Sequence, residues 1–378
     1  MVVLSEEQVM LRDMAAEWAR ERMPVTAYRK LFTGAFPLGH DPAAWADMAA
    51  MGWAGIVVPE ELGGVDFGYR SLGLVLEELG KSLAASPLIS SALIVATALR
   101  LAGTAEQQAR WLPGIADGSV IGALALDEGP RHAPLATALT ARQRGDGWQL
   151  DGLKRPVPDG MAASLFVVVA RTSGGPGDGD GLTLFLVEPD AVGLARTSLD
   201  QVDARSPALL TLAGVALAGD AVLGPVGGAG VLLDRILDCG RAGIAAEMLG
   251  TASQAFETVL DYLKTRVQFG QLIGSFQALQ HRAGAMFGEL QLLRSAVEAA
   301  LAALDVGDAE APQLVSLAKA MAGDTLHRIS NEMIQLHGGI GMTHEHDAGL
   351  YLKRARVADQ SYGNAAFHRE RWGRLNGF

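Results

Sequence analysis

The spacing of hydrophobic and polar positions changes twice along the chain, and it predicts three segments. Up to about residue 118 the apolar positions follow a helical period. Two helix starts there carry polar caps: Ser5 precedes Glu-Glu-Gln, a capping-box pattern, and Asp41 precedes a proline. Between residues 119 and 225 four short runs are apolar or alternating, as strands are: VIGALALDE, GWQLDGLK, SLFVVVART and LTLFLVEPD. From residue 226 the helical period returns over many turns.

The order of these segments limits the possible architectures. Strands that do not alternate with helices disfavour a doubly wound parallel sheet. The chain also shows no glycine-rich dinucleotide fingerprint or phosphate-binding loop in the right context. We therefore predict an α+β fold that is mainly α, with an N-terminal all-α domain (1–118), a middle β-domain (119–225) and a C-terminal helical bundle (226–378). The run TSGGPGDGDG is expected to be an exposed hairpin connection.

Composition removes several classes of partner and site. The net charge of −11 is spread along the chain and no basic stripe occurs, which argues against nucleic acid or an anionic membrane. The single cysteine, Cys239, excludes an internal disulfide framework and a multi-cysteine metal site. No signal-peptide pattern or apolar run long enough to span a bilayer is evident. We expect a cytoplasmic protein.

One apolar stretch is unusually rich in hydrogen-bonding groups. RVQFGQLIGSFQALQH (266–281) carries an arginine, four glutamines and a histidine among Val, Phe, Leu and Ile. With the residues after it, this stretch resembles the helical signature of the acyl-CoA dehydrogenase family. QLHGGIGMTHEHDAGLYLKRA resembles that family's second C-terminal motif, and VPEELGGVDFGYRSLGLVLEELG resembles its N-terminal counterpart. The three motifs lie in the family's order, and the resemblance covers essentially the whole chain.

The resemblance implies a fold and an activity. The fold would be an N-terminal helical domain, a middle β-domain and a C-terminal four-helix bundle. The activity would be FAD-dependent oxidation of a CoA thioester, with an electron-transfer flavoprotein as the electron acceptor. Family members are homo- or hetero-oligomers, usually dimers of dimers, in which the first motif reaches the flavin nucleotide of a neighbouring subunit.

Individual residues acquire roles from this resemblance. Arg266 would pair with the pyrophosphate, because a guanidinium fork suits phosphate oxygens. Phe269 would pack on the nucleotide. The other residues of the implied cofactor site are Gln268, Gln277, Gln335, Gly338 and Gly339. The alternative is that these polar groups cap helices and bridge subunits without any cofactor.

Three further residue types were considered. Arg241 resembles the family arginine beside the acyl thioester, and an interfacial salt bridge is the alternative. The histidines 281, 337, 344 and 346 are not spaced as a metal site, so none is predicted. Cys239 is interpreted as a small apolar residue.

The usual catalytic base is missing from both of its family positions. In most members a glutamate precedes a glycine after the second motif; here Gly363 matches that glycine and Tyr362 stands before it. Tyrosine, with an ordinary pKa near 10, is a poor base at neutral pH. Other members carry the glutamate before the arginine of the long helix, and that position is Gly240. No catalytic residue is therefore identified. Glu247 is a distant substitute, about 10 Å along the helix from Gly240.

Two other acids are expected to form ion pairs instead. Asp359 and Glu345 lie near Lys353, Arg354 and Arg356, and we expect them to pair with these cations.

The residues that would face the flavin ring also depart from the family. A Thr or Ser usually precedes a glutamate there, and here Asp127 precedes Glu128. Pro156 and Pro158 replace a Trp-x-Thr/Ser run, and proline offers no amide donor. The sequence therefore keeps the nucleotide side of the implied site and loses the ring side.

Three functions remain open at this point. The first is an acyl-CoA dehydrogenase subunit that lacks the carboxylate and shares a flavin site with a partner. The second is an inactive structural or regulatory relative. The third is a flavin monooxygenase on the same fold, because such relatives also lack the carboxylate. The acyl group could be a fatty-acid, branched, aromatic or steroid side chain.

Overall fold

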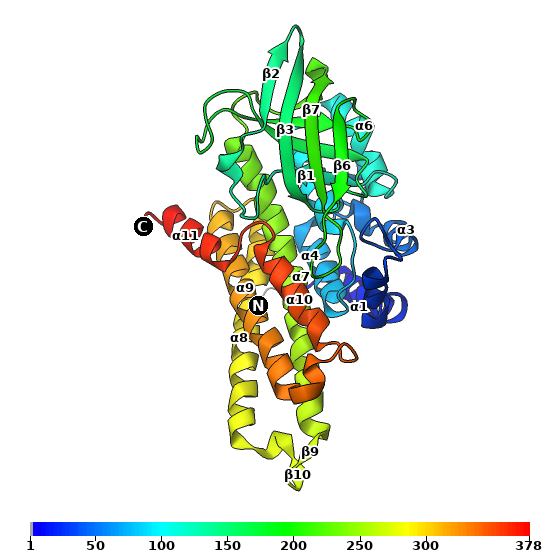
Figure 1. Ribbon diagram of the computed structural model, residues 1–378, viewed down its shortest axis with the longest axis vertical. Helices are drawn as coiled ribbons and strands as arrows, with labels where there is room; N and C mark the ends of the chain where they lie inside the picture. Colours follow the sequence, from blue (N-terminus) through cyan, green and yellow to red (C-terminus); the bar gives the residue numbers. More distant parts are fainter. Residues whose placement is uncertain (1–2) are drawn as a thin grey trace. The chain divides into compact units, whose positions relative to one another are not determined.

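The computed structural model describes residues 3–378, which form two compact units. The helical unit combines the N-terminal segment up to Arg29 with residues 73–84 and 241–378. The sheet unit combines residues 30–72 with residues 85–240. Two helices, α4 (Gly68–Lys81) and α7 (Gly230–Thr265), contribute residues to both (Figure 1). The domain boundaries at residues 118 and 225 stay a prediction.

The helical unit contains the long C-terminal helices. Besides its parts of α4 and α7, its helices are α1 (Glu6–Arg22), α2 (Val25–Tyr28), α8 (Gln277–Val306), α9 (Ala311–His337), α10 (Ala348–Gln360) and α11 (Ala365–Leu375). A small hairpin, β9 (Val267–Gln268) and β10 (Gln271–Leu272), lies between α7 and α8. The predicted capping box is confirmed at the start of α1, where the Ser5 hydroxyl accepts from the Gln8 amide at 3.2 Å.

The sheet unit is built on eight strands. They are β1 (Gly122–Ala125), β2 (Thr140–Arg144), β3 (Gly147–Val157), β4 (Leu165–Arg171), β5 (Leu182–Val187), β6 (Leu194–Ser198), β7 (Ala208–Leu217) and β8 (Val222–Leu223). The order is β6-β7-β3-β2-β4-β5-β8, and β1 pairs with β4 in parallel. The helices of this unit include α3 (Pro42–Ala50), α5 (Ala96–Ala102), α6 (Ala105–Ala116) and a π-helix over Leu88–Val95. Asp41 caps α3, as predicted.

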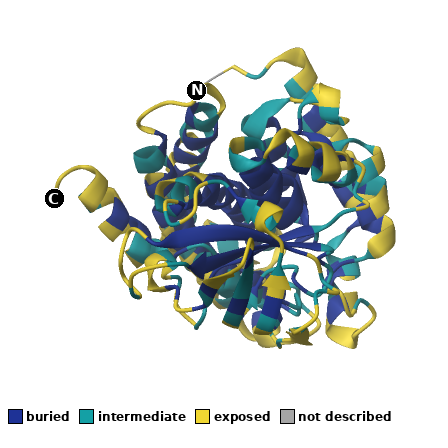
Figure 2. Cartoon of the chain, turned by 90° about the horizontal axis from the view of Figure 1, so that it is seen from above, coloured by how far each residue is buried: buried dark blue, intermediate teal, exposed yellow. Residues whose placement is uncertain are grey.

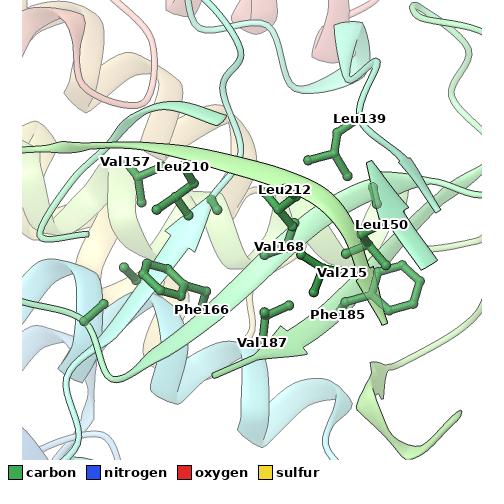
Figure 3. Close-up of a cluster of buried hydrophobic side chains, with 14 of the residues drawn as sticks. Leu139, Leu150, Val157, Phe166, Val168, Phe185, Val187, Leu210, Leu212 and Val215 are labelled. Atoms are coloured by element: carbon green, nitrogen blue, oxygen red, sulfur yellow. The ribbon is translucent and has the colours of Figure 1, made fainter. Parts of the chain in front are cut away.

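Two strands of the sheet, β4 and β5, are buried along their whole length. Every residue of β4 and β5 is buried, which explains why these strands appear in the sequence as continuous hydrophobic runs (Figure 2). They pair antiparallel, and the ten residues between them form the predicted, mostly exposed connection. Phe166, Val168 and Phe185 from these strands join Leu150, Leu212 and Val215 in one buried cluster (Figure 3).

Four strands were not predicted from the sequence. β7 alternates buried and accessible positions only irregularly, and β3 pairs with it through two register shifts. β6 lies at one edge of the sheet and has no buried residue, so it lacks a hydrophobic pattern. β2 is mostly exposed, and β8 has only two residues.

Two glycines let α4 and α7 approach closely within the helical unit. A Cβ built on Gly250 would lie 1.8 Å from the carbonyl oxygen of Glu77, and one on Gly80 would lie 2.2 Å from that of Glu247. Each obstacle is helix backbone, which cannot rotate away as a side chain could. The contact therefore requires glycine on both helices.

We predict that Gly250→Ala destabilises the protein by about 1–3 kcal/mol or more, because the new methyl group overpacks this contact. Gly284→Ala is the matched control: it lies in α8, and its added Cβ would meet nothing within 4 Å. The control should be neutral or slightly stabilising, by about 0.5–1 kcal/mol. Urea unfolding followed by circular dichroism measures both, and equal stabilities would contradict the expectation.

Candidate functional site

The first predicted cofactor motif lies at the end of α7 and is open to solvent. Arg266, Gln268 and Gln277 are exposed within the helical unit. Phe269 is 90% exposed at the tip of the β9–β10 hairpin, and its backbone is left-handed, with φ at 56°. A large aromatic side chain held this far into solvent contributes little to the unit's own core. The motif is thus presented outward.

The second motif lies at the end of α9, also at the surface. Gln335, Gly338 and Gly339 are exposed. Gly338 has a φ of 63°, which favours glycine, whereas Gly339 has no such backbone. A Cβ added at Gly339 would meet nothing within 4 Å, so contacts within this chain do not require glycine there. At these two glycines no side chain covers the backbone, so a nucleotide could approach it closely.

The turn at the family's base position joins α10 to α11 and is built on buried nitrogen donors. Lys319 Nζ, from α9, donates to the carbonyls of Asp359 at 2.9 Å and Gly363 at 2.8 Å. Arg241 Nε donates to the Tyr362 carbonyl at 3.4 Å. All three side chains that reach this turn, from Lys319, Arg241 and His368, are fully buried. Arg241, predicted to bind substrate, contacts this turn in the structure.

Burial controls the protonation of the groups around this turn. It lowers the pKa of Lys319 to about 7, and the nearby Asp359 carboxylate opposes that shift. Burial, together with the charges of Lys319 and Arg241, lowers the pKa of His368 to about 2. His368 is therefore neutral, and its Nε2 lies 3.1 Å from the Tyr362 carbonyl oxygen, to which it donates.

The backbone of the turn leaves little room for a new side chain. Tyr362 and Gly363 have φ values of 57° and 103°. A Cβ at Gly363 would lie 2.4 Å from the Phe367 ring and 2.9 Å from His368 Nε2. A side chain at Gly363 would therefore require Phe367 and His368 to move.

The two acids near this turn, Glu247 and Asp359, form hydrogen bonds and ion pairs that the sequence did not indicate. Glu247 accepts from Arg354 Nε at 2.8 Å, and both side chains are buried. The Glu247 carboxylate is therefore already paired with a buried guanidinium. Asp359 accepts from the Ala365 amide at 3.3 Å. Pairing of Asp359 and Glu345 with Lys353, Arg354 or Arg356 stays a prediction.

Asp127 and Pro156, two of the residues expected to face the flavin ring, lie close together in the sheet unit. Asp127 belongs to the loop after β1. Asp127 Oδ2 lies 3.0 Å from His132 Nδ1, and Asp127 Oδ1 accepts from the Ala133 amide at 3.2 Å. The Asp127 carbonyl accepts from the Arg155 amide, which precedes Pro156, at 2.6 Å. At this position, where the resemblance implies a hydroxyl, the chain presents a carboxylate, and the prolines at 156 and 158 offer no amide donors.

A buried lysine that the sequence analysis missed fixes this loop. Lys154 Nζ donates to the Leu126 carbonyl at 2.8 Å and to Glu128 at 2.7 Å. Burial lowers the pKa of Lys154 to about 8, against the opposing charge of Glu128. Glu128 also accepts from the amides of Ala138 and Leu139. The sequence did offer one signal, because Lys154 ends the predicted strand GWQLDGLK. A lysine that a strand buries needs a polar partner, since lysine is rarely fully buried without one.

The described residues, 3–378, hold neither a membrane-spanning helix nor a cluster of metal ligands. No helix among them is long and apolar enough to cross a membrane. No group of three or more His, Cys, Asp or Glu side chains in that range is arranged to hold a metal ion.

Comparison with known proteins places these features in a family. Family models match the acyl-CoA dehydrogenase N-terminal domain over residues 5–119 and its C-terminal domain over residues 227–375. The probable acyl-CoA dehydrogenase YngJ of Bacillus subtilis is 32% identical over 376 residues, covering 97% of each protein. The solved Tcur3481-Tcur3483 steroid ACAD variant is 32% identical, with a TM-score of 0.87 and 98% of each chain covered.

A second structure is similar at lower identity. The ChsE4-ChsE5 complex from Mycobacterium tuberculosis has a TM-score of 0.88 at 27% identity and covers 100% of this chain and 99% of that one. The fold and the motifs define a flavin-dependent dehydrogenase class. The chain belongs to the acyl-CoA dehydrogenase family, as an oxidoreductase with FAD as its cofactor. The predicted fold class is confirmed.

We predict that Lys319→Met destabilises the protein by about 1–3 kcal/mol, because two buried carbonyls lose their donor. The folded pKa near 7 lies below the ordinary 10.5, so the unfolded chain binds more protons between these values. The wild type therefore gains stability as pH rises from about 7 to 10, and Lys319→Met lacks that gain. Urea unfolding across this pH range, with the exposed Lys264→Met as control, measures the difference. A pH-independent difference would contradict the prediction.

Proposed function

We propose that this chain is a carboxylate-less subunit of a heteromeric acyl-CoA dehydrogenase, which oxidises a CoA thioester at its α,β bond. A partner subunit carries the carboxylate, and the two subunits share a flavin site. The observation that carries the proposal is the contrast between outward-facing nucleotide motifs and the lack of a carboxylate at either family base position. Tyr362 and Gly240 occupy those positions.

The ion pair of Glu247, the acid considered as a substitute base, supports the proposal. Glu247 is held in a buried pair with Arg354. A base must come within hydrogen-bond reach of the proton that it removes. In the proposed assembly, a carboxylate from another subunit meets that requirement.

Each chain would then contribute a different part of the site. Arg266 would hold the pyrophosphate, Gln268 and Gln277 would donate to the nucleotide, and Phe269 would pack against it. Gln335 with Gly338 and Gly339 would approach the adenosine half. When bound, FAD supplies the hydride acceptor for the oxidation. Arg241 would lie beside the thioester, and an electron-transfer flavoprotein would receive the electrons.

Similar proteins support the choice of a heteromer and suggest a substrate class. The ChsE4-ChsE5 structure is a complex, and the Tcur3481-Tcur3483 protein is a steroid ACAD. Both are similar over almost the whole length of this chain. We therefore infer a partner from the same family and, within the acyl-CoA class, a CoA thioester with a steroid side chain as the first substrate to test.

The visible absorbance spectrum tests the proposal directly. The chain is purified alone and after coexpression with a carboxylate-bearing relative encoded nearby, and bound flavin and dehydrogenase activity are measured. We expect flavin and activity only with the partner. Full activity of the isolated homomer would refute a shared site. Failure of every partner to restore flavin would favour an inactive relative, and reduced-flavin-dependent oxygen consumption would favour a monooxygenase.

We predict that Arg266→Ala weakens flavin retention by the assembly roughly tenfold to a hundredfold, because a charge-assisted bond to phosphate is lost. Lys264→Ala is the matched control, since it removes the same charge from an exposed position two residues away. Flavin release after dilution, followed by fluorescence, measures both. Equal release from the two variants would show that Arg266 does not hold the nucleotide.

A further inference from the structure

A stack of three rings joins the segments that carry the two nucleotide motifs. The centroid of the His337 ring lies 4.3 Å from that of Tyr262 and 4.3 Å from that of His346. Tyr262 precedes Arg266 by four residues, and His337 lies between Gln335 and Gly338. The stack thus connects the end of α7, the end of α9 and the loop before α10 within the helical unit.

Hydrogen bonds fix the central ring of the stack. His337 is buried, and its Nδ1 donates to the Met333 carbonyl at 2.7 Å. The Tyr262 hydroxyl donates to the His337 carbonyl at 3.4 Å. Burial lowers the pKa of His337, which keeps the ring neutral between its two neighbours. The ring therefore has both its orientation and its charge state set by the surrounding helix ends.

The third ring is anchored from the other side. His346 Nδ1 accepts from the Ala348 amide at 3.1 Å. Arg29 Nε donates to Asp347 at 3.0 Å, and Arg29 Nη1 donates to the His344 carbonyl at 2.6 Å. The loop that carries His346 is consequently held in place by a residue from the N-terminal segment.

We propose that His337 is a positioning residue that sets the Arg266 hairpin and the Gln335–Gly339 turn relative to each other for nucleotide binding. Two aromatic contacts of this kind contribute beyond ordinary area burial. The named cofactor residues of both motifs are exposed, whereas His337, inside the second motif, is buried. The nucleotide part of this inference rests on the proposed function, whereas the mechanical coupling does not.

Amide hydrogen exchange of the chain without cofactor tests the coupling. His337→Ala removes both ring contacts and should raise exchange in residues 266–276 and in residues 338–346. His337→Phe keeps the stack and should leave the first segment near the wild-type rate. His281→Ala, on exposed α8 surface, is the control. If His337→Ala leaves residues 266–276 unchanged, the inference is overturned, whether or not the chain ever binds flavin.

A double-mutant cycle tests the consequence for the nucleotide. In the flavin-holding assembly, His337→Ala should weaken flavin retention roughly tenfold, and His337→Phe should restore most of it. In an Arg266→Ala background the same change should have a much smaller effect, because the hairpin no longer presents its guanidinium. Strictly additive effects would show a general loss of stability and would refute positioning. An assembly without flavin would instead count against the proposed function.

Discussion

Buried cations must find oxygen partners, and in this protein those partners are largely carbonyl groups of loops. Lys319 is fully buried and donates to the carbonyls of Asp359 and Gly363. Lys154, in the sheet unit, is fully buried and donates to the Leu126 carbonyl as well as to Glu128. Leaving such a group without partners costs several kcal/mol. The α10–α11 turn and the loop after β1 are therefore held in place, because their carbonyl groups supply the hydrogen-bond acceptors that these buried nitrogens need.

A third buried cation applies the same constraint to the loop after β1 and to the connection between β4 and β5. Arg171, in β4, donates to the carbonyls of Leu135 and Thr137, and to those of Asp178 and Asp180. Glu128 holds the same loop through the amides of Ala138 and Leu139. The loop that follows Asp127 is thus tied by both its carbonyls and its amides. Its backbone can keep one conformation while the side chains that it displays change.

The physical basis of each prediction explains why some features were visible in the sequence and others were not. Ser5 and Asp41 act through their nearest neighbours in the chain, so their caps could be predicted from local spacing. β4 and β5 are buried on both faces and appear as unbroken apolar runs. β6 has no buried position, and Lys319 or Arg354 gain their partners 40 and 107 residues away. Such pairings follow from the fold and carry no local signal.

The Tyr362–Gly363 turn, where the resemblance places the catalytic base, is held by backbone contacts. A Cβ at Gly363 would overlap the Phe367 ring, and the Tyr362 carbonyl accepts from Arg241 and His368. Lys319, Arg241 and His368 bind backbone carbonyls of this turn, so these contacts do not depend on which side chain stands at position 362. The exposed parts of the nucleotide motifs are less enclosed, since Gly270, Gly338 and Gly339 have open space around them. In the proposed shared site, each subunit is constrained only by the half that it supplies. A chain that keeps the nucleotide motifs and lacks its own base is then the expected outcome.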